Sequence, residues 1–194
     1  MANILKVLVI LNCCFLSACA TPQSYVDPEY HKTSYEDIQR SNKPVRTKVT
    51  AHFQRNGAPL PAVNSEVQGH VERTLRASGV FVPTIENAEA SIEVTANNIA
   101  DLETARAKGF KTGFTFYAAG SMVDDNYVFT YIYRSAEGKE QKYSYAHAIH
   151  TAIGRTERPA GLTPTTIADA FGRVVEDSTL NFVRDLQKDN ILSN

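Results

Sequence analysis

The stretch YVFTYIYRSAEGKEQKYSYAH at residues 127–147 predicts a β-hairpin whose register is set by its own side chains. Two runs of alternating aromatic and smaller residues flank Ala136-Glu137-Gly138, a three-residue loop in which the glycine takes the left-handed position. The opposed side chains on one face are then Tyr131 with Tyr143, Phe129 with Tyr145, and Tyr127 with His147, and Tyr133 lies on the same face. A slip by one residue would put Ser144 and Ala146 opposite aromatic residues, so we expect the pattern to select its own pairing.

The chain before the hairpin predicts several strands and one helix. Residues 45–54 alternate strictly between apolar and polar side chains, which is typical of a half-buried strand. Apolar residues recur at helical spacing through residues 63–78, with Asn64 or Ser65 as candidate N-caps and Gly79 as the C-terminal stop. Further strands are predicted at residues 80–82, 90–97 and 114–122, and Asp124-Asp125-Asn126 predicts a turn into the hairpin.

The chain after the hairpin predicts a second, longer helix. Thr163 followed by Pro164 is a typical pair of N-cap and first helical residue, and a drifting apolar stripe then continues to near Gln187. Because this helix has a broad apolar face, we expect it to lie across one face of the sheet. The predicted fold is an α+β two-layer sandwich, with a mostly antiparallel sheet of about five strands and two main helices.

One segment of this pattern resembles a known family of folds. The residues Leu75-Arg76-Ala77-Ser78-Gly79-Val80-Phe81, followed by an alternating run at residues 88–94, resemble the N-terminal domain of TolB and related periplasmic lipoprotein folds. In that family a helix ends in a Ser-Gly pair before a strand with an apolar residue and a phenylalanine. The resemblance covers a short part of the chain and implies a fold, not a function.

The N-terminus has the order of features of a secretory signal peptide. Lys6 is followed by the apolar run at residues 7–11 and by small residues before a cysteine, and the stretch is too short to favour a membrane span. The residues Leu16-Ser17-Ala18-Cys19 resemble the lipobox of bacterial lipoproteins. The resemblance implies cleavage before Cys19, a diacylglycerol on its sulfur and an acylated amine, which together suffice for stable membrane anchoring. An ordinary secreted protein with a chance cysteine is the alternative.

The residue after the cysteine bears on which membrane holds the anchor. Ala20 stands where lipoproteins kept in the inner membrane of enteric bacteria typically carry aspartate, so the resemblance favours the outer membrane, with the domain on the periplasmic side. Cleavage would also remove Cys13 and Cys14. The mature chain would then contain only Cys19, so we expect no intramolecular disulfide.

Residues 20–44 are polar, contain three prolines and have no strand or helix periodicity, which predicts a flexible tether. Tyr25, Tyr30 and Tyr35 recur every five residues, a spacing that fits no regular element, and we expect loosely packed aromatic side chains there. The predicted organisation is a lipoprotein signal peptide (1–18), the lipidated cysteine and tether (19–44), a single α+β periplasmic domain (45–188) and a C-terminal tail (189–194).

Composition narrows the classes of function. The 194 residues include 20 Lys and Arg and 21 Asp and Glu, a formal net charge of −1, so we expect no nucleic-acid partner. Hydrophobic residues make up 43% and charged residues 21%, which excludes a wholly disordered or disulfide-dense chain. No nucleophile motif or phosphate-binding loop is present, so we expect neither an enzyme nor a cofactor. We also expect no metal, because the strand spacing of His147 and His150 puts them on opposite faces.

Two groups of residues are candidates for an interaction surface. The first is the aromatic face made of Tyr127, Phe129, Tyr131, Tyr133, Tyr143 and Tyr145, which is either core beneath the second helix or a partly open surface. The second is a basic loop with Arg155 and Arg158, which could meet anionic headgroups or an acidic partner, or could be an ordinary solvated loop.

We therefore expect an outer-membrane-anchored periplasmic lipoprotein that acts through contacts with an envelope protein, in envelope assembly, transport or maintenance. The alternative is a binding protein for a small apolar molecule or lipid, with a cavity between the aromatic face and the helix after Thr163. An envelope hydrolase is a third and weaker alternative, because it would need convergent polar side chains that the sequence does not reveal.

Overall fold

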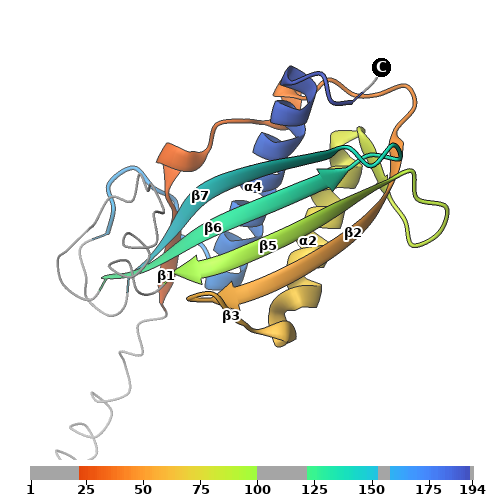
Figure 1. Ribbon diagram of the computed structural model, residues 1–194. Coiled ribbons are helices and arrows are strands. Elements are labelled where there is room, and N and C mark those ends of the chain that lie inside the picture. Colours follow the sequence, from red (N-terminus) through yellow and green to blue (C-terminus); the bar gives the residue numbers. More distant parts are fainter. Residues whose placement is uncertain (1–21, 100–121, 153–157, 193–194) are drawn as a thin grey trace, which may run out of the picture.

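The computed structural model describes residues 22–99, 122–152 and 158–192, which form a mixed sheet with two helices (Figure 1). The strands run in the order β1-β7-β6-β5-β2-β3, and β4 pairs with β2 off this path. Their bounds are β1 Gln23–Val26, β2 Val45–Arg55, β3 Ala58–Pro59, β4 Phe81–Pro83, β5 Ala90–Ile99, β6 Met122–Arg134 and β7 Glu140–Ala152. The α+β class is confirmed.

The sheet has seven strands, so the expected count of about five is wrong. The extra strands include β1, with four residues, and β3, with two, which are too short to show a periodic pattern in the sequence. Strand β2 runs parallel to both β4 and β5, and the remaining pairs are antiparallel. The sheet is therefore mixed.

The predicted hairpin register is confirmed. Strands β6 and β7 pair Tyr131 with Tyr143, Phe129 with Tyr145, and Tyr127 with His147. Gly138 has φ 77°, and its N–H donates to the Ser135 carbonyl at 3.0 Å, which closes the loop. The aromatic pattern and the left-handed glycine together determine this pairing.

Strand β6 begins at Met122, so the turn expected at residues 124–126 is wrong. Asp124 lies opposite His150 in the ladder, and its carboxylate contacts the ring Nδ1 of His150 at 2.7 Å. Asp125 accepts a hydrogen bond from the Asn98 amide at 3.0 Å. These long-range partners offset the local preference of Asp124 and Asp125 for a turn. The part of the expected strand at residues 114–121 lies outside the described residues.

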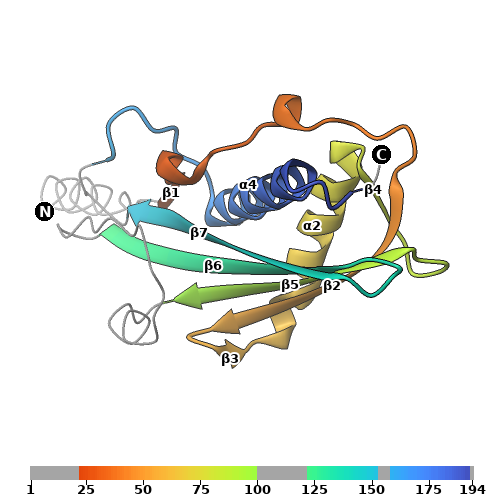
Figure 2. The same ribbon diagram turned by 45° about the horizontal axis from the view of Figure 1, so that its top comes forward.

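Two helices lie on the same face of the sheet, α2 (Asn64–Ser78) and α4 (Ile167–Lys188) (Figure 2). Gly79 ends α2 with φ 71°, as predicted, but neither expected N-cap is present, because the Asn64 side chain accepts from the Phe53 N–H instead. Helix α4 starts later than expected. Its N-cap is Thr166, whose hydroxyl accepts from the Asp169 N–H, and not Thr163.

The core fills the space between the sheet and the two helices α2 and α4. Phe129 and Tyr131 are fully buried, and the Tyr131 ring stacks on Phe182 at 4.7 Å between centroids. The Tyr131 hydroxyl lies 2.8 Å from Ser178 Oγ and 3.0 Å from Thr179 Oγ1. Burial raises the pKa of Tyr131 to about 12, so the phenol stays neutral.

The segment from residue 22 to residue 44 is packed on the domain, so the flexible tether expected there is wrong. Strand β1 joins the sheet beside β7, and residues 27–44, which we call the strap, then run along the outer side of α4 (Figure 2). Tyr25 is 1% exposed, and Tyr30 and Ile38 are also buried. Burial of these apolar side chains offsets the cost of ordering the chain.

Candidate functional site

The predicted aromatic face is core. Tyr127, Phe129, Tyr131 and Tyr133 are all buried. The two tyrosines of β7 lie at its rim, where the hydroxyl of Tyr143 donates to Asp189 at 2.6 Å and that of Tyr145 to Asp185 at 2.9 Å. Desolvation, with the acidic partner, raises the pKa of both phenols. Arg158 is exposed, whereas Arg155 and Cys19 lie outside the described residues.

A carboxylate on α4 joins the strap to the sheet. Asp177 Oδ1 lies 2.8 Å from His31 Nδ1 on the strap, and Asp177 Oδ2 lies 3.2 Å from His147 Nε2 on β7. His147 is 1% exposed, and its Nδ1 accepts from the Ala148 N–H at 2.9 Å. Because Nδ1 accepts, the hydrogen on Nε2 is the one that the ring donates to Asp177. We call His31, Asp177 and His147 the clasp.

Further polar contacts along α4 hold the strap. The Thr33 hydroxyl donates to Asn181 Oδ1 at 2.7 Å, and Arg184 donates to the Thr33 hydroxyl at 2.6 Å. Nearer the helix end, Gln187 donates to the Gln39 carbonyl and accepts from the Gln39 N–H. Each contact joins residues about 150 positions apart in the chain, so short-range sequence patterns cannot reveal them.

His150 belongs to a separate cluster. Its Nδ1 lies 2.7 Å from Asp124, and its Nε2 lies 3.3 Å from Asp27, just after β1. His147 contacts α4 instead, so the two histidines do not converge on one site. Among the residues that the structure describes, no group of three or more His, Cys, Asp or Glu side chains is placed to hold a metal ion.

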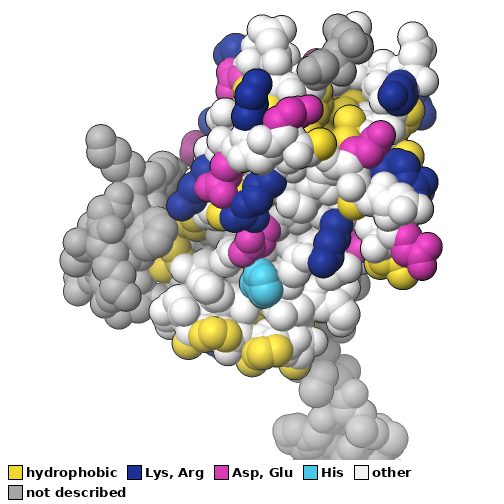
Figure 3. All heavy atoms as spheres, turned by 45° about the vertical axis from the view of Figure 1, so that its right-hand side comes forward, with side chains coloured by type: hydrophobic (Ala, Val, Ile, Leu, Met, Phe, Trp, Pro, Cys, Tyr) yellow, Lys and Arg dark blue, Asp and Glu magenta, His cyan; other side chains and the backbone are white. Residues whose placement is uncertain are grey.

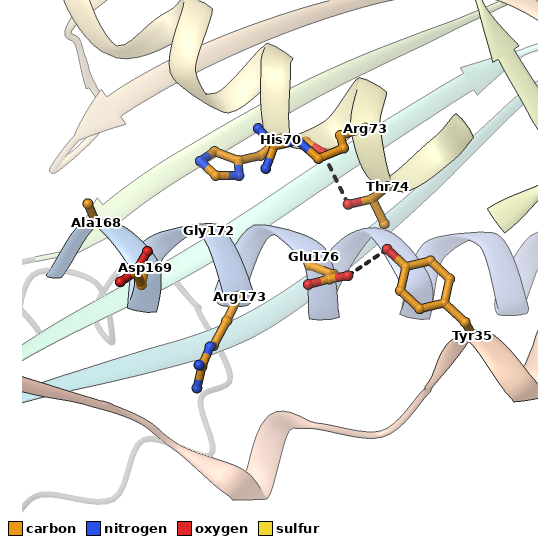
Figure 4. A pocket seen from close by; sticks show the side chains of 9 residues that line it. All are labelled: Tyr35, His70, Arg73, Thr74, Ala168, Asp169, Gly172, Arg173 and Glu176. Atoms are coloured by element: carbon orange, nitrogen blue, oxygen red, sulfur yellow. Dashed lines mark hydrogen bonds between the residues drawn. The ribbon is translucent and has the colours of Figure 1, made fainter. Parts of the chain in front are cut away.

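A groove lies between α2, α4 and the strap (Figure 4). It encloses about 240 Å³ and is lined by Tyr35, His70, Arg73, Thr74, Ala168, Asp169, Gly172, Arg173 and Glu176. A second hollow of about 450 Å³ continues under the strap and shares Tyr35, Arg173 and Glu176 with it. The strap thus completes a site whose other walls come from two helices.

Electrostatics in this groove are set by partial burial. The Tyr35 hydroxyl donates to Glu176 at 2.5 Å, and desolvation together with this carboxylate raises the pKa of Tyr35 to about 12. Desolvation, with Arg73 nearby, lowers the pKa of His70, so that ring is neutral at pH 7. Within the described part of the chain, the guanidinium groups of Arg73 and Arg173 have no hydrogen-bond or ion-pair partner. The groove can therefore offer two guanidinium groups to a small polar molecule.

A loop projects from the far right of Figure 1, at residues 83–89, from the last residue of β4 to the start of β5. Arg46 donates to the Asn87 carbonyl at 3.2 Å, to the Thr84 hydroxyl at 3.2 Å and to the Glu86 carbonyl at 3.0 Å. Ile85 is nevertheless 90% exposed. The bonds from Arg46 therefore hold a loop on which one large apolar side chain is exposed to solvent.

No protein-family model and no curated protein matches the chain. The chain is similar to solved structures at low identity. A PelC variant dodecamer from Paraburkholderia phytofirmans is 11% identical, with a TM-score of 0.38, over 84% of this chain and 98% of that one. A Caulobacter crescentus protein assigned as a lipoprotein is 12% identical, with a TM-score of 0.36, over 74% of this chain and 85% of that one.

A minor lipoprotein from Acinetobacter baumannii is 11% identical, with a TM-score of 0.38, over 78% of this chain and 96% of that one. TM-scores of this size do not assign a function. Neither helix of the described residues has the length and apolar composition that crossing a bilayer requires.

Proposed function

We propose that this protein is a bacterial lipoprotein, anchored in the outer membrane through acylated Cys19, whose periplasmic domain is a non-enzymatic binding module. Its role is contact with other envelope proteins in assembly, transport or maintenance. The proposal rests on the lipobox at residues 16–19 and on where the folded domain begins.

The observation that carries the proposal is the short distance in sequence between Cys19 and β1. Gln23, the first residue of β1, is four residues after Cys19. Fully extended, that spacer reaches about 14 Å. A domain anchored through so short a spacer lies directly at the membrane surface, with one end of its sheet facing the lipid.

The end of the domain that faces away from the membrane then presents the loop at residues 83–89. Glu86 and Glu89 follow Ile85 in this loop, and Glu137 lies on the exposed hairpin loop at the same end of the sheet. This combination suits a protein partner with a small apolar pocket and a basic rim, because apolar anchors and complementary charges together give specific contacts.

The alternative function, binding of a small apolar molecule beneath the second helix, has less support. It needs a cavity between the aromatic face and α4, but Tyr131 and Phe182 stack there and both are fully buried. The filled core around this ring pair leaves that ligand no room beneath the middle of α4.

Replacement of Cys19 tests the anchor. We expect Cys19→Ala to lose metabolic acyl label and to move from the membrane to the soluble periplasmic fraction. Cys14→Ala is the matched control, since cleavage before Cys19 would remove that residue, and it should keep label and location. A wild-type protein without acyl label would contradict the proposal.

A photo-crosslinking amino acid tests the contact with a partner in living cells. Placed at Ile85, it should give a discrete protein adduct, whereas at Lys48, an exposed residue of β2, it should not. Equal adducts at both positions, or none at Ile85, would contradict a partner at this loop.

A further inference from the structure

An apolar groove opens at the end of the domain where α2 and α4 begin. It encloses about 260 Å³ and is lined by Phe53, Val63, Glu66, Tyr127, Ile167, Ala168 and Phe171. Two of the largest exposed apolar side chains lie on or beside it. Ile167 is 49% exposed and lines it, and Leu60, whose N–H donates to the Phe53 carbonyl at 2.8 Å, is 41% exposed.

Exposed hydrophobic side chains gather at this end of the molecule. Ala58, Pro59, Leu60, Pro61 and Ala62 are exposed in succession around β3, and Figure 3 shows hydrophobic side chains at the lower end, where β3 lies. Elsewhere on this side of the molecule, Figure 3 shows positive and negative side chains interspersed with smaller hydrophobic areas. A concentrated apolar surface of this kind marks a contact site.

The same end of the domain holds the start of β1. Ser24 N–H donates to the Thr165 carbonyl at 2.9 Å, and Thr165 N–H donates to the Ser24 carbonyl at 2.8 Å. Ile167 begins α4 two residues after Thr165. The spacer from Cys19 therefore enters the fold beside the apolar groove.

We infer that the apolar groove, together with Leu60 and Ile167, is a membrane-contact site that takes the acyl chains of the bilayer lipids. This inference rests on the proposed anchor and adds the orientation of the domain and the residues that enter the lipid. The occupant follows from the spacer, because an anchor with a reach of about 14 Å brings this end to the bilayer surface before any other.

Charges around the groove are compatible with a lipid surface. Arg55 ends β2, Arg158 follows β7, and both are exposed at this end of the sheet. Guanidinium groups pair well with phosphate, which the lipid headgroups supply. Glu66 is exposed at the rim of the groove, where headgroup water keeps its carboxylate solvated.

The absence of tryptophan from the sequence gives a direct test. Leu60→Trp and Ile85→Trp each introduce a single fluorophore, at the groove and at the opposite end. The acylated full-length mature proteins are reconstituted in phosphatidylethanolamine and phosphatidylglycerol vesicles whose acyl chains carry bromine, a quencher confined to the hydrocarbon. We expect Leu60→Trp to lose most of its emission and Ile85→Trp to lose none.

Flotation of the vesicles distinguishes the proposed anchor at Cys19 from the proposed membrane-contact site at the groove. If the variants float but the tryptophan of Leu60→Trp is not quenched, the membrane-contact site is wrong and the anchor stands. If the acylated protein does not float, the anchor itself is wrong. Shielding of that tryptophan from a soluble quencher without bromine quenching would show that a protein or a second copy covers the groove, which also overturns the inference. Ile167→Trp serves if Leu60→Trp does not fold.

Discussion

Ser24 and Thr165 exchange both backbone hydrogen bonds, at 2.9 and 2.8 Å. The pair closes the outer edge of β1 and ties it to the chain that leads into α4. The Ser24 hydroxyl also contacts Thr151 Oγ1 at 3.0 Å across to β7. Because this joint lies only five residues after Cys19, an anchor there would hold the sheet and α4 directly.

The clasp is expected to stabilise the strap. In Asp177→Asn the side chain can accept from only one of its two histidine partners and turns its amide toward the other. We expect a loss of about 1–3 kcal/mol in the free energy of unfolding, the usual cost of a buried polar group without a partner. Urea denaturation followed by circular dichroism measures it.

Glu176→Gln is the matched control for the clasp, because Glu176 directly precedes Asp177 on α4 and its partner Tyr35 is 40% exposed. Its effect should stay within about 0.5 kcal/mol, as for most surface substitutions. Equal effects of the two variants would show that the clasp contributes no more than an exposed contact.

The close contact between His70 on α2 and Gly172 on α4 leads to a second prediction. A Cβ added at Gly172 would lie 2.7 Å from the His70 ring, which packs edge-on against Phe171. In the wild type this clash should cancel or exceed the gain of about 1 kcal/mol that alanine brings over glycine in a helix. In a His70→Ala background, where the ring is absent, Gly172→Ala should be stabilising.

A double-mutant cycle in urea measures this coupling. The same effect of Gly172→Ala in both backgrounds would contradict the close contact between His70 and Gly172.

His70 should make stability depend on pH. Its pKa is lowered in the folded protein, first by desolvation and then by Arg73, so the unfolded chain binds the proton more readily. The stability that neutral His70 contributes is therefore fully present above the unfolded pKa of about 6.5. It declines as the pH falls from there through the lowered pKa of the folded protein. His70→Gln should lose less stability than the wild type over this interval. Parallel pH profiles of the two proteins in thermal melts would contradict the prediction.

Arg46 is predicted to keep the loop at residues 83–89 rigid. Removing its guanidinium in Arg46→Gln breaks the bonds to Thr84, Glu86 and Asn87. We expect faster amide hydrogen exchange in this loop, with little change in α2 or β6, because the loop is exposed and opens locally. Unchanged exchange would show that the remaining bonds of Thr84 and Glu89 suffice, contrary to this account.

The sequence predicts the features that depend on neighbouring residues. The β6–β7 register follows from alternating aromatic residues and Gly138, and the end of α2 follows from Gly79. Both signals lie within the element that they define. Local patterning of this kind is therefore sufficient for the hairpin and for the end of α2.

The features that the sequence analysis missed depend on distant partners. Strand β1 has four residues, and its Tyr25 is buried against a strand more than 120 positions away. Asp124 and Asp125 have turn-forming side chains but are bonded to His150 and Asn98 inside the sheet. The polar composition of the strap hides its packing in the same way, because many of its contacts are hydrogen bonds to α4. Tyr25 and Tyr30, which their spacing predicts to be loosely packed, are buried.

The height of the two ends of the domain above the bilayer tests the central claim most directly. Ser65→Cys, at the start of α2, and Ala136→Cys, on the hairpin loop, each provide a labelling site, since Cys19 would be acylated in the mature protein. Strand β6 runs between these ends and spans about 40 Å at 3.3 Å per residue. Resonance energy transfer from each label to acceptor-labelled headgroups should be much higher for Ser65→Cys. Equal transfer from both sites, or higher transfer from Ala136→Cys, would contradict a domain held on the membrane by the end at which β1 begins.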